Sequence, residues 1–318
     1  MNTKRPLLSL VVIAHNMAAQ LSNTLHSLFT DYQRGINQED YEVLILENNS
    51  AYCLPQNIIE KLPANFSYTL RDEKSPSPVA AVNEGLRRAK GEWLGLMIDG
   101  AHLLTPGVLQ YIKLAQKIDK NAFVTVPAYH LGYKEQNESA KEGYNEQVES
   151  ELLEKISWPE NGYRLFEIGT RCANNDRGYF APILESNCFF APRQAYEKIG
   201  YADMDFQLPG GGSINLHMTR QLGTLEELKF ITLAGEGSFH QFHGGVTSSA
   251  QRELVVEDHK KQLHGKWGGD YKHLARNPII LGHFPEPALN ELHESSKMMV
   301  RRSNVCKKNN WPLWPDDL

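Results

Sequence analysis

The stretch Glu92-Trp93-Leu94-Gly95-Leu96-Met97-Ile98-Asp99-Gly100-Ala101 decides how this chain folds. Its apolar run, Trp93 to Ile98, shows no polar alternation, which is typical of a strand covered on both faces. The run ends on a single carboxylate, Asp99, and ligands of open parallel α/β sheets bind at such carboxyl ends. A hard cation that bridges two phosphates takes oxygen ligands of this kind. A second carboxylate two residues further on would strengthen such a site, but Ala101 stands there.

Strands and helices alternate around this stretch over the first hundred residues. Strands are predicted at 7–14, 41–46 and 66–70, and helices at 17–29 and 79–90. This order indicates a mostly parallel sheet flanked by helices. Polar residues also follow two other strands, as His15-Asn16 and Glu47-Asn48-Asn49. Because parallel strands bring such ends to one edge, the sequence predicts a polar edge that includes Asp99.

The second half of the chain shows a less regular pattern. A helix is predicted from Thr105-Pro106-Gly107 to about residue 118, and a polar surface segment at 134–154. The remaining predictions are strands at 122–129, 180–190 and 229–233 and helices at 194–199 and 214–222. Beyond about residue 250 we expect a helical extension. The chain is therefore divided into a first domain at 1–250 and an extension at 251–318.

Composition narrows the class of protein. The chain has 318 residues, 41% of them hydrophobic, and a formal net charge of −5, which argues against a nucleic-acid partner. Its four cysteines are widely spaced without a C-x-x-C pair, as expected for reduced thiols. The apolar run at 7–14 is short for a signal peptide and too short to span a bilayer. We therefore expect a cytoplasmic protein.

Several motifs, taken in order, resemble family-2 glycosyltransferases with the GT-A fold. They are Val11-Val12-Ile13-Ala14-His15-Asn16, Leu44-Ile45-Leu46-Glu47-Asn48-Asn49-Ser50, the segment 81–94, Glu185-Ser186-Asn187 and Ile199-Gly200-Tyr201-Ala202-Asp203. Their order and spacing make the resemblance specific, and it covers residues 7 to 245. It implies an α/β GT-A domain, a nucleotide-diphospho-sugar transferase-like fold. It also implies transfer of a sugar from a nucleoside diphosphate sugar to a glycan or lipid-linked acceptor hydroxyl, assisted by a divalent cation, Mn²⁺ or Mg²⁺.

The resemblance also implies which residues bind the donor. Glu47 would accept a hydrogen bond from the base or ribose, with a turn-capping carboxylate as the alternative. Arg71 and Asn83 would line the pocket, although Arg71 fits a surface ion pair equally well. Asp99 would hold the cation on the diphosphate, with a capping role in the next turn as its alternative. The full set expected to bind the nucleotide sugar is His15, Asn16, Glu47, Asn49, Arg71, Asn83 and Asp99.

The chain departs from the family pattern at its metal motif. The Asp-x-Asp motif is reduced to Asp99-Gly100-Ala101. His240 and His243 could complete a mixed oxygen and nitrogen site with Asp99, a donor set that suits Mn²⁺ better than Mg²⁺. A late histidine ligand in some GT-A enzymes supports this hypothesis by analogy, and ordinary loop histidines are the alternative. His102 could also contribute to this site, but it follows Asp99 by three residues and is expected to point elsewhere.

A second departure removes the usual catalytic base. The family's Glu-Asp pair is replaced by the carboxylate-free Gly211-Gly212-Ser213-Ile214-Asn215. An inverting transfer needs a base near the acceptor hydroxyl, and the acidic candidates are Glu185, Asp203 and Asp205, of which we select Glu185 and Asp205 as catalytic. Glu185 comes first because its apolar sequence neighbours would raise its pKa. A retaining mechanism would need no such base, and the sequence does not distinguish the two.

Other interpretations stay open beside this one. The missing carboxylates also fit a catalytically silent GT-A protein that binds nucleotide sugars or glycans. A nucleotidyltransferase is disfavoured, since no glycine-rich basic loop follows the first strand. The loop at 210–213 could be a lid, a phosphate-binding helix start or a plain turn. The basic residues of the extension could contact an anionic inner membrane face that carries the acceptor, or be simply solvated: Lys297, Arg301, Arg302, Lys307 and Lys308.

Overall fold

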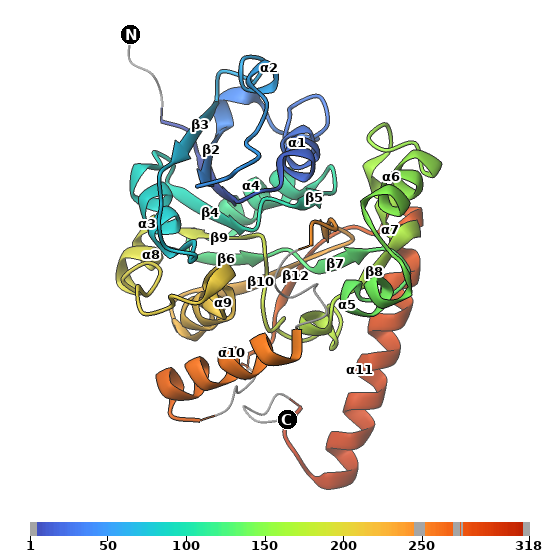
Figure 1. Ribbon diagram of the computed structural model, residues 1–318. Coiled ribbons are helices and arrows are strands. Elements are labelled where there is room, and N and C mark those ends of the chain that lie inside the picture. Colours follow the sequence, from blue (N-terminus) through green and yellow to red (C-terminus); the bar gives the residue numbers. More distant parts are fainter. Residues whose placement is uncertain (1–4, 245–251, 270–273, 275, 314–318) are drawn as a thin grey trace.

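The computed structural model describes residues 5–244, 252–269, 274 and 276–313. Its main sheet has eight strands in the order β12-β10-β6-β9-β4-β1-β2-β3 (Figure 1). The strands are β1 Leu8–Ala14, β2 Tyr41–Asn48, β3 Phe66–Arg71, β4 Trp93–Ile98, β6 Ala122–Thr125, β9 Phe189–Pro192, β10 Lys229–Ala234 and β12 Ile279–Gly282. Only β9 runs antiparallel to its neighbours, β4 and β6. The predicted mostly parallel sheet flanked by helices is confirmed.

Helices bury both faces of this sheet, as the apolar runs of its strands require. In β1, Leu8, Leu10 and Val12 belong to one core cluster, while Val11 and Ile13 belong to another, because side chains alternate along a strand. The first cluster includes residues of α1 Ala18–His26 and α4 Val108–Ile118. The second includes residues of α3 Val79–Arg88, α8 Arg193–Lys198 and α9 Ile214–Thr224. A short helix, α2 Gln56–Ile59, precedes β3.

A smaller sheet of four strands lies beside the main one, in the order β5-β11-β7-β8. Its strands are β5 His102–Leu104, β7 Ala128–Leu131, β8 Gly169–Arg171 and β11 Ser238–His240. The helices α5 Gln136–Ser139, α6 Glu146–Lys155 and α7 Leu165–Ile168 come from the segment between β7 and β8. The smaller sheet and this helical segment share a separate core cluster, which includes Leu103, Tyr129 and Phe239.

Two predicted strands are wrong in extent. The single strand predicted at 122–129 is two strands in two sheets, β6 and β7, because Pro127 between them has no amide hydrogen to continue a ladder. The strand predicted at 180–190 is confined to β9. Before it, Pro182 lacks an amide donor, and the Ser186 hydroxyl bonds to the carbonyl oxygens of Val126 and Cys188.

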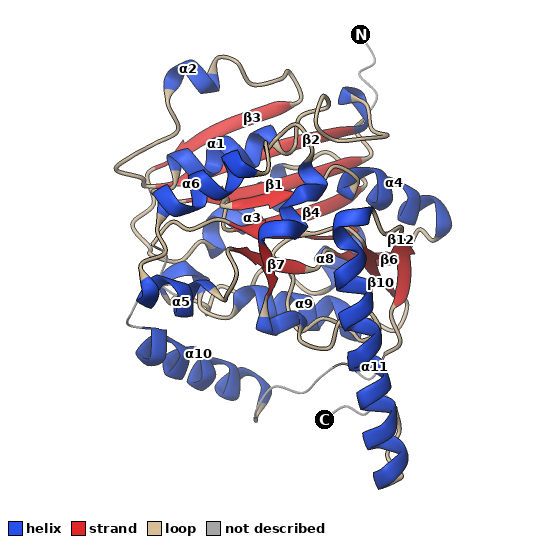
Figure 2. Cartoon of the chain, turned by 90° about the vertical axis from the view of Figure 1, so that its right-hand side faces the viewer, coloured by secondary structure: helices blue, strands red, loops and turns tan. Residues whose placement is uncertain are grey.

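The C-terminal part contains α10 Arg252–Trp267, β12 and α11 Leu289–Asn309. β12 pairs in parallel with β10, so the segment expected to be a helical extension also supplies the edge strand of the main sheet. α10 lies beside α9, and α11 projects beyond the body of the molecule (Figures 1 and 2). Among the described residues, no helix is long and apolar enough to cross a membrane. The division at 250/251 and a membrane contact of α11 stay predictions.

Candidate active site

Three parallel strands deliver polar residues to one edge of the main sheet. β1 lies between β2 and β4 and is followed by His15 and Asn16, whereas Asn49 follows β2 and Asp99 follows β4. Asn16, Asn49 and Asp99 all have positive φ angles, of 51°, 38° and 86°. Non-glycine residues rarely adopt this conformation, and it clusters at functional sites where the surroundings hold it. The predicted polar edge is therefore present.

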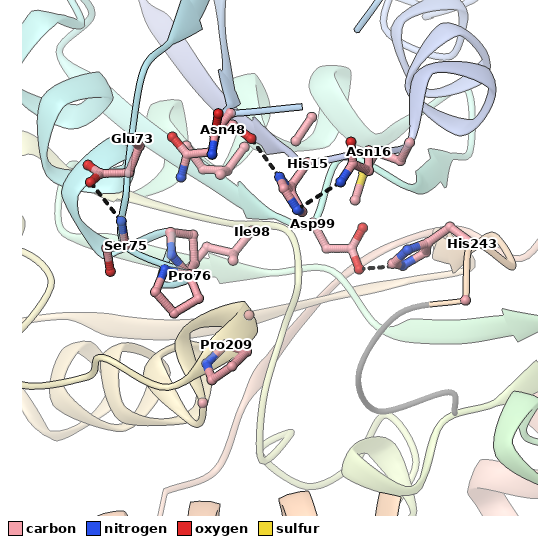
Figure 3. Close-up of a pocket in the computed structure, with 18 of the residues that line it drawn as sticks. His15, Asn16, Asn48, Glu73, Ser75, Pro76, Ile98, Asp99, Pro209 and His243 are labelled. Atoms are coloured by element: carbon pink, nitrogen blue, oxygen red, sulfur yellow. Dashed lines mark hydrogen bonds and ion pairs between the residues drawn. The ribbon is translucent and has the colours of Figure 1, made fainter. Parts of the chain in front are cut away.

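A cavity of about 620 Å³ opens at this edge (Figure 3). It is lined by the ends of β1, β2 and β4, by residues 73–76 after β3, and by the glycine-rich loop that carries Pro209 and Gly210. His243 closes one side next to Asp99. We call this space the first cavity, and its size is typical of small-molecule sites.

Hydrogen bonds hold the walls of the first cavity in place. His15 Nδ1 lies 2.6 Å from the carbonyl oxygen of Asn48, and Asn16 Oδ1 accepts from the amide of Ala51 at 2.6 Å. Arg71 donates to Asn48 Oδ1 at 2.7 Å and to Glu73 at 3.3 Å. Arg71 itself does not line the cavity, so it positions two residues that do.

Asp99, His240 and His243 converge on one point, and we call them the Asp-His-His cluster. Asp99 Oδ2 lies 3.2 Å from His240 Nε2 and 2.9 Å from His243 Nε2, and the two Nε2 atoms are 3.2 Å apart. Adjacent ligand atoms of an octahedral ion with bonds of about 2.1 Å lie about 3.0 Å apart. The donor set and its spacing therefore fit a divalent cation of the Mn²⁺ type.

Charge within the cluster favours this interpretation. Burial raises the pKa of Asp99, but the charge of His243 and hydrogen bonds from both histidines outweigh it, so its pKa lies well below the usual range. For His243, burial lowers the pKa, while the charge of Asp99 outweighs burial and raises it. An ionised carboxylate facing two imidazole nitrogens is stabilised by a proton or by a metal ion between them.

Two side chains from the polar segment at 134–154 support the cluster. Gln136 Oε1 lies 2.5 Å from His240 Nδ1, and its amide donates to the carbonyl oxygen of His240 at 2.9 Å. Glu149 accepts from the amide of Phe242 at 2.8 and 3.0 Å. With a proton on Nδ1 bonded to Gln136, His240 can give up the proton on Nε2 and offer this nitrogen to a metal ion beside Asp99. The sequence prediction treated this segment as solvated and missed both residues, which carry no motif.

His102 lies against the cluster rather than pointing elsewhere, so that expectation is wrong. β5 runs antiparallel to β11, which pairs His102 with His240. A ring nitrogen of His102 lies within 4.8 Å of a carboxylate oxygen of Asp99 and of a ring nitrogen of His240. Its Nδ1 is 3.0 Å from Ser238 Oγ and its Nε2 is 3.0 Å from Asn187 Nδ2. Burial lowers its pKa well below the usual range, so it is neutral and orients Asn187.

A second cavity, of about 320 Å³, is also lined by Asp99. Glu185 lines it, and burial raises the pKa of Glu185 to about 7, against a hydrogen bond from Asn174 that lowers it. The two cavities share the wall residues Ile98, Asp99, Gly210, Gly212 and His259. They therefore meet at Asp99, between the glycine-rich loop and α10.

Besides Arg71, three residues predicted for the site line neither cavity. Glu47 is fully buried and accepts from the amide of Leu54 and the Tyr68 hydroxyl, which is the turn-supporting alternative. Asn83 bonds the backbone amide and carbonyl of Ala202. Asp205 is 76% exposed and pairs with Lys266 of α10. These contacts are internal to the fold, so we carry none of the three into the proposed site.

The first cavity also contains residues that the sequence prediction did not select. Asn48, Glu73, Lys74 and Ser75 line it at the ends of β2 and β3. The sequence contains a pattern that points to Glu73, because this residue closely follows a predicted strand, just as Asp99 follows another strand. His259 of α10 lines both cavities, and no motif marks it.

Comparisons with known proteins identify the family of this chain and solved structures similar to it. The model of the family described as Glycosyl transferase family 2 matches residues 9–186, more than half of the chain. Among curated proteins no match is found. S. aureus TarS 1-349 is similar in structure with a TM-score of 0.51 at 12% identity, over 74% of this chain and 60% of that one. The same protein in complex with UDP gives a TM-score of 0.52 at 11% identity, over 81% and 72%. Its complex with UDP-GlcNAc gives a TM-score of 0.51 at 12% identity, over 81% of this chain and 66% of that one. This likeness confirms the GT-A fold.

Proposed function

This chain belongs to glycosyl transferase family 2, and on that premise we propose that it transfers a sugar from a nucleoside diphosphate sugar to an acceptor hydroxyl. The observation that carries the proposal is the meeting of two cavities at Asp99. The first cavity, with Asp99 and His243 on its wall, is the proposed donor site. The second, with Glu185, is the proposed acceptor site. The complexes of TarS with UDP and UDP-GlcNAc support a nucleotide-bearing donor.

The residues of the Asp-His-His cluster would hold a divalent cation, Mn²⁺ or Mg²⁺. Such a cation neutralises the charge that develops on a diphosphate leaving group. Asp99 would supply the oxygen ligand, and His240 and His243 the nitrogen ligands. Gln136 bonds to the carbonyl oxygen of His240, and Glu149 bonds to the amide of Phe242 next to His243. Ala101 stands where the second carboxylate would be. It is fully buried in the core, and its amide donates to Asp99 Oδ1 at 2.9 Å.

Glu185 is the proposed base. It lines the second cavity, and its pKa of about 7 lets it accept a proton from a hydroxyl near neutral pH. The carboxylate-free segment Gly211–Asn215 includes Gly212 and Ser213, which line the same cavity. In this proposal Glu185, a carboxylate from a different segment, serves in place of the missing pair.

A catalytically silent binding protein is the second candidate function. The observation that favours it is the absence of a carboxylate at Ala101 and at Gly211–Asn215. Such a protein would bind a nucleotide sugar in the first cavity without releasing the nucleotide. Both candidates predict donor binding, so turnover is the property that separates them.

Release of nucleoside diphosphate tests the proposal directly. Wild-type protein is incubated with a panel of UDP- and GDP-sugars and Mn²⁺ or Mg²⁺, beside Asp99→Ala. Asp31→Asn serves as the control, since Asp31 is exposed and lines neither cavity. We expect cation-dependent release by wild type and the control, and its loss in Asp99→Ala. Undiminished release by Asp99→Ala would contradict the metal role, and donor binding without any release would favour the binding protein.

A further inference from the structure

The first turns of α11 dock onto the end of β8. Arg171, the last residue of β8, donates to the Glu291 carboxylate from Nε at 3.0 Å and from Nη2 at 2.5 Å. The same Nη2 donates to the carbonyl oxygen of Glu291 at 3.1 Å and to Ser295 Oγ at 3.0 Å. The side chains of this ion pair are only 10% and 15% exposed. Charge-assisted bonds of this kind are short and directional, so they fix how the helix lies on the strand.

A second contact fixes the chain a few residues further on. Ser295 is fully buried, and its hydroxyl oxygen also accepts from the amide of Tyr179 at 3.3 Å. Gly178 has a positive φ of 69°, and a Cβ atom there would lie 2.9 Å from the Cα atom of Ser295. The Arg171 guanidinium lies 5.4 Å from the centre of the Tyr179 ring. The helix therefore holds the segment 171–179 at both of its ends.

The segment between these two contacts forms part of the wall of the second cavity. Cys172, Ala173 and Asn174 directly follow β8 and line this cavity. The carbonyl oxygen of Asn174 accepts from the amide of Leu184 at 2.9 Å, and its side chain hydrogen-bonds to Glu185. That side-chain bond opposes the rise in pKa that burial causes at Glu185. A series of direct contacts thus connects α11 to the proposed base.

We propose that the Arg171–Glu291 ion pair positions the proposed base, Glu185. The pair holds the wall segment 172–174, and Asn174 in that segment holds the Glu185 carboxyl where it can take a proton from an acceptor. α11 itself lines neither cavity, so it acts only through these contacts. This inference rests on the proposed function, in which Glu185 is the base, and it makes the C-terminal helix part of the catalytic unit.

Two variants release the wall to different degrees. Glu291→Gln keeps the length of the side chain and removes its charge, so it weakens the bonds from Arg171. Ser295→Ala is milder, because it keeps the ion pair and removes only the hydroxyl. Glu294→Gln is the matched control, since Glu294 lies on the same helix and pairs with Lys297 at the surface, with side chains 40% and 47% exposed. Urea unfolding establishes that each variant is folded.

The first measurement is the pKa of Glu185 itself, which needs no turnover. Carbon NMR of protein with labelled glutamate carboxyls follows the titration, and Glu185→Gln identifies the signal. In wild type, burial raises this pKa to about 7 against the bond from Asn174. Loss of that bond raises the pKa further, so we expect an increase of about half a pH unit or more in Glu291→Gln. The increase should be smaller in Ser295→Ala and absent in Glu294→Gln.

The second measurement separates positioning from general damage. UDP affinity in the presence of Mn²⁺ should be the same in Glu291→Gln as in wild type, because neither Arg171 nor Glu291 lines the first cavity. Nucleoside diphosphate release at pH 7 should fall about fivefold or more. Its rise with pH should move to higher pH together with the pKa of Glu185. Equal losses of UDP affinity and of release would indicate general damage and overturn the inference.

The outcomes separate this inference from the proposed function. An unchanged pKa of Glu185 in folded Glu291→Gln and Ser295→Ala would overturn it, and so would an equal change in the control Glu294→Gln. If Glu291→Gln does not fold, the titration of Ser295→Ala decides. Absence of nucleotide release by wild type contradicts the proposed function, and the titration then still decides whether α11 holds the carboxyl in place.

Discussion

Gln136→Met tests whether the Asp-His-His cluster binds metal in the arrangement that the structure shows. Gln136 is fully buried and makes two hydrogen bonds to His240, one to Nδ1 and one to its carbonyl oxygen. Methionine has a similar length and no comparable donor or acceptor, so the substitution removes both bonds and keeps the packing. His240 would then lose the partner that selects its tautomer and fixes its ring.

The size of the effect follows from those two bonds. A buried hydrogen bond contributes about 0.5–1.5 kcal/mol net, so the loss of both should lower the free energy of unfolding by about 1–3 kcal/mol. Loss of a partner that orients a metal ligand typically lowers metal affinity about 10- to 100-fold, which is about 1.4–2.7 kcal/mol. We therefore expect Mn²⁺ affinity to fall about 10- to 100-fold.

Titration of Mn²⁺ followed by electron paramagnetic resonance measures this affinity without any donor or acceptor. Gln33→Met is the matched control, because Gln33 is also buried and donates to the carbonyl oxygens of Ser27 and Thr105, neither of which belongs to the cluster. The control should lower the free energy of unfolding and leave Mn²⁺ affinity unchanged. Wild-type affinity in folded Gln136→Met, or an equal loss of affinity in the control, would refute the reasoning.

Three further predictions concern catalysis and stability. Glu185→Gln should lower the rate of sugar transfer about 10²- to 10⁴-fold with nucleotide affinity retained. The wild-type rate should rise with pH through about 7 as the carboxyl ionises. A wild-type rate in the variant would exclude Glu185 as the base. Burial raises the pKa of Glu236 from 4.5 to about 7, so its contribution to stability, complete below about 4.5, is lost as pH rises through about 7. Urea unfolding at several pH values should show this fall in wild type and not in Glu236→Gln. Gly95→Ala should destabilise by about 1–3 kcal/mol, since its Cβ would lie 2.2 Å from the Phe190 ring, and Phe190→Leu should restore part of the loss in thermal melts.

The elements of the main sheet were predictable where one local pattern accounts for them. β4 has the bounds that its apolar run predicts, and β1 differs from its prediction by one residue. Both strands are buried on two faces, and such strands contain hardly any polar residue. The break between β6 and β7 was missed because the strand prediction did not weigh Pro127, whose missing amide ends a ladder.

The cluster was predictable only in part. Asp99 stands at a strand end, and the resemblance to a known family drew attention to His240 and His243. Gln136 and Glu149 could not be predicted, since a polar segment without periodicity has the composition of a solvated surface. Their burial results from packing against residues about a hundred positions away.

The sequence alone predicts a mostly parallel α/β sheet, a polar edge at the carboxyl ends of its strands, and the carboxylate of Asp99 at that edge. These properties follow from local patterns, because burial of a strand and the end of a strand are both visible in neighbouring residues. Only the tertiary structure decided that two cavities meet at Asp99, that His102 faces His240, and that Glu185 lines the second of these cavities. Each of these depends on contacts between distant segments, whose spacing no local pattern records.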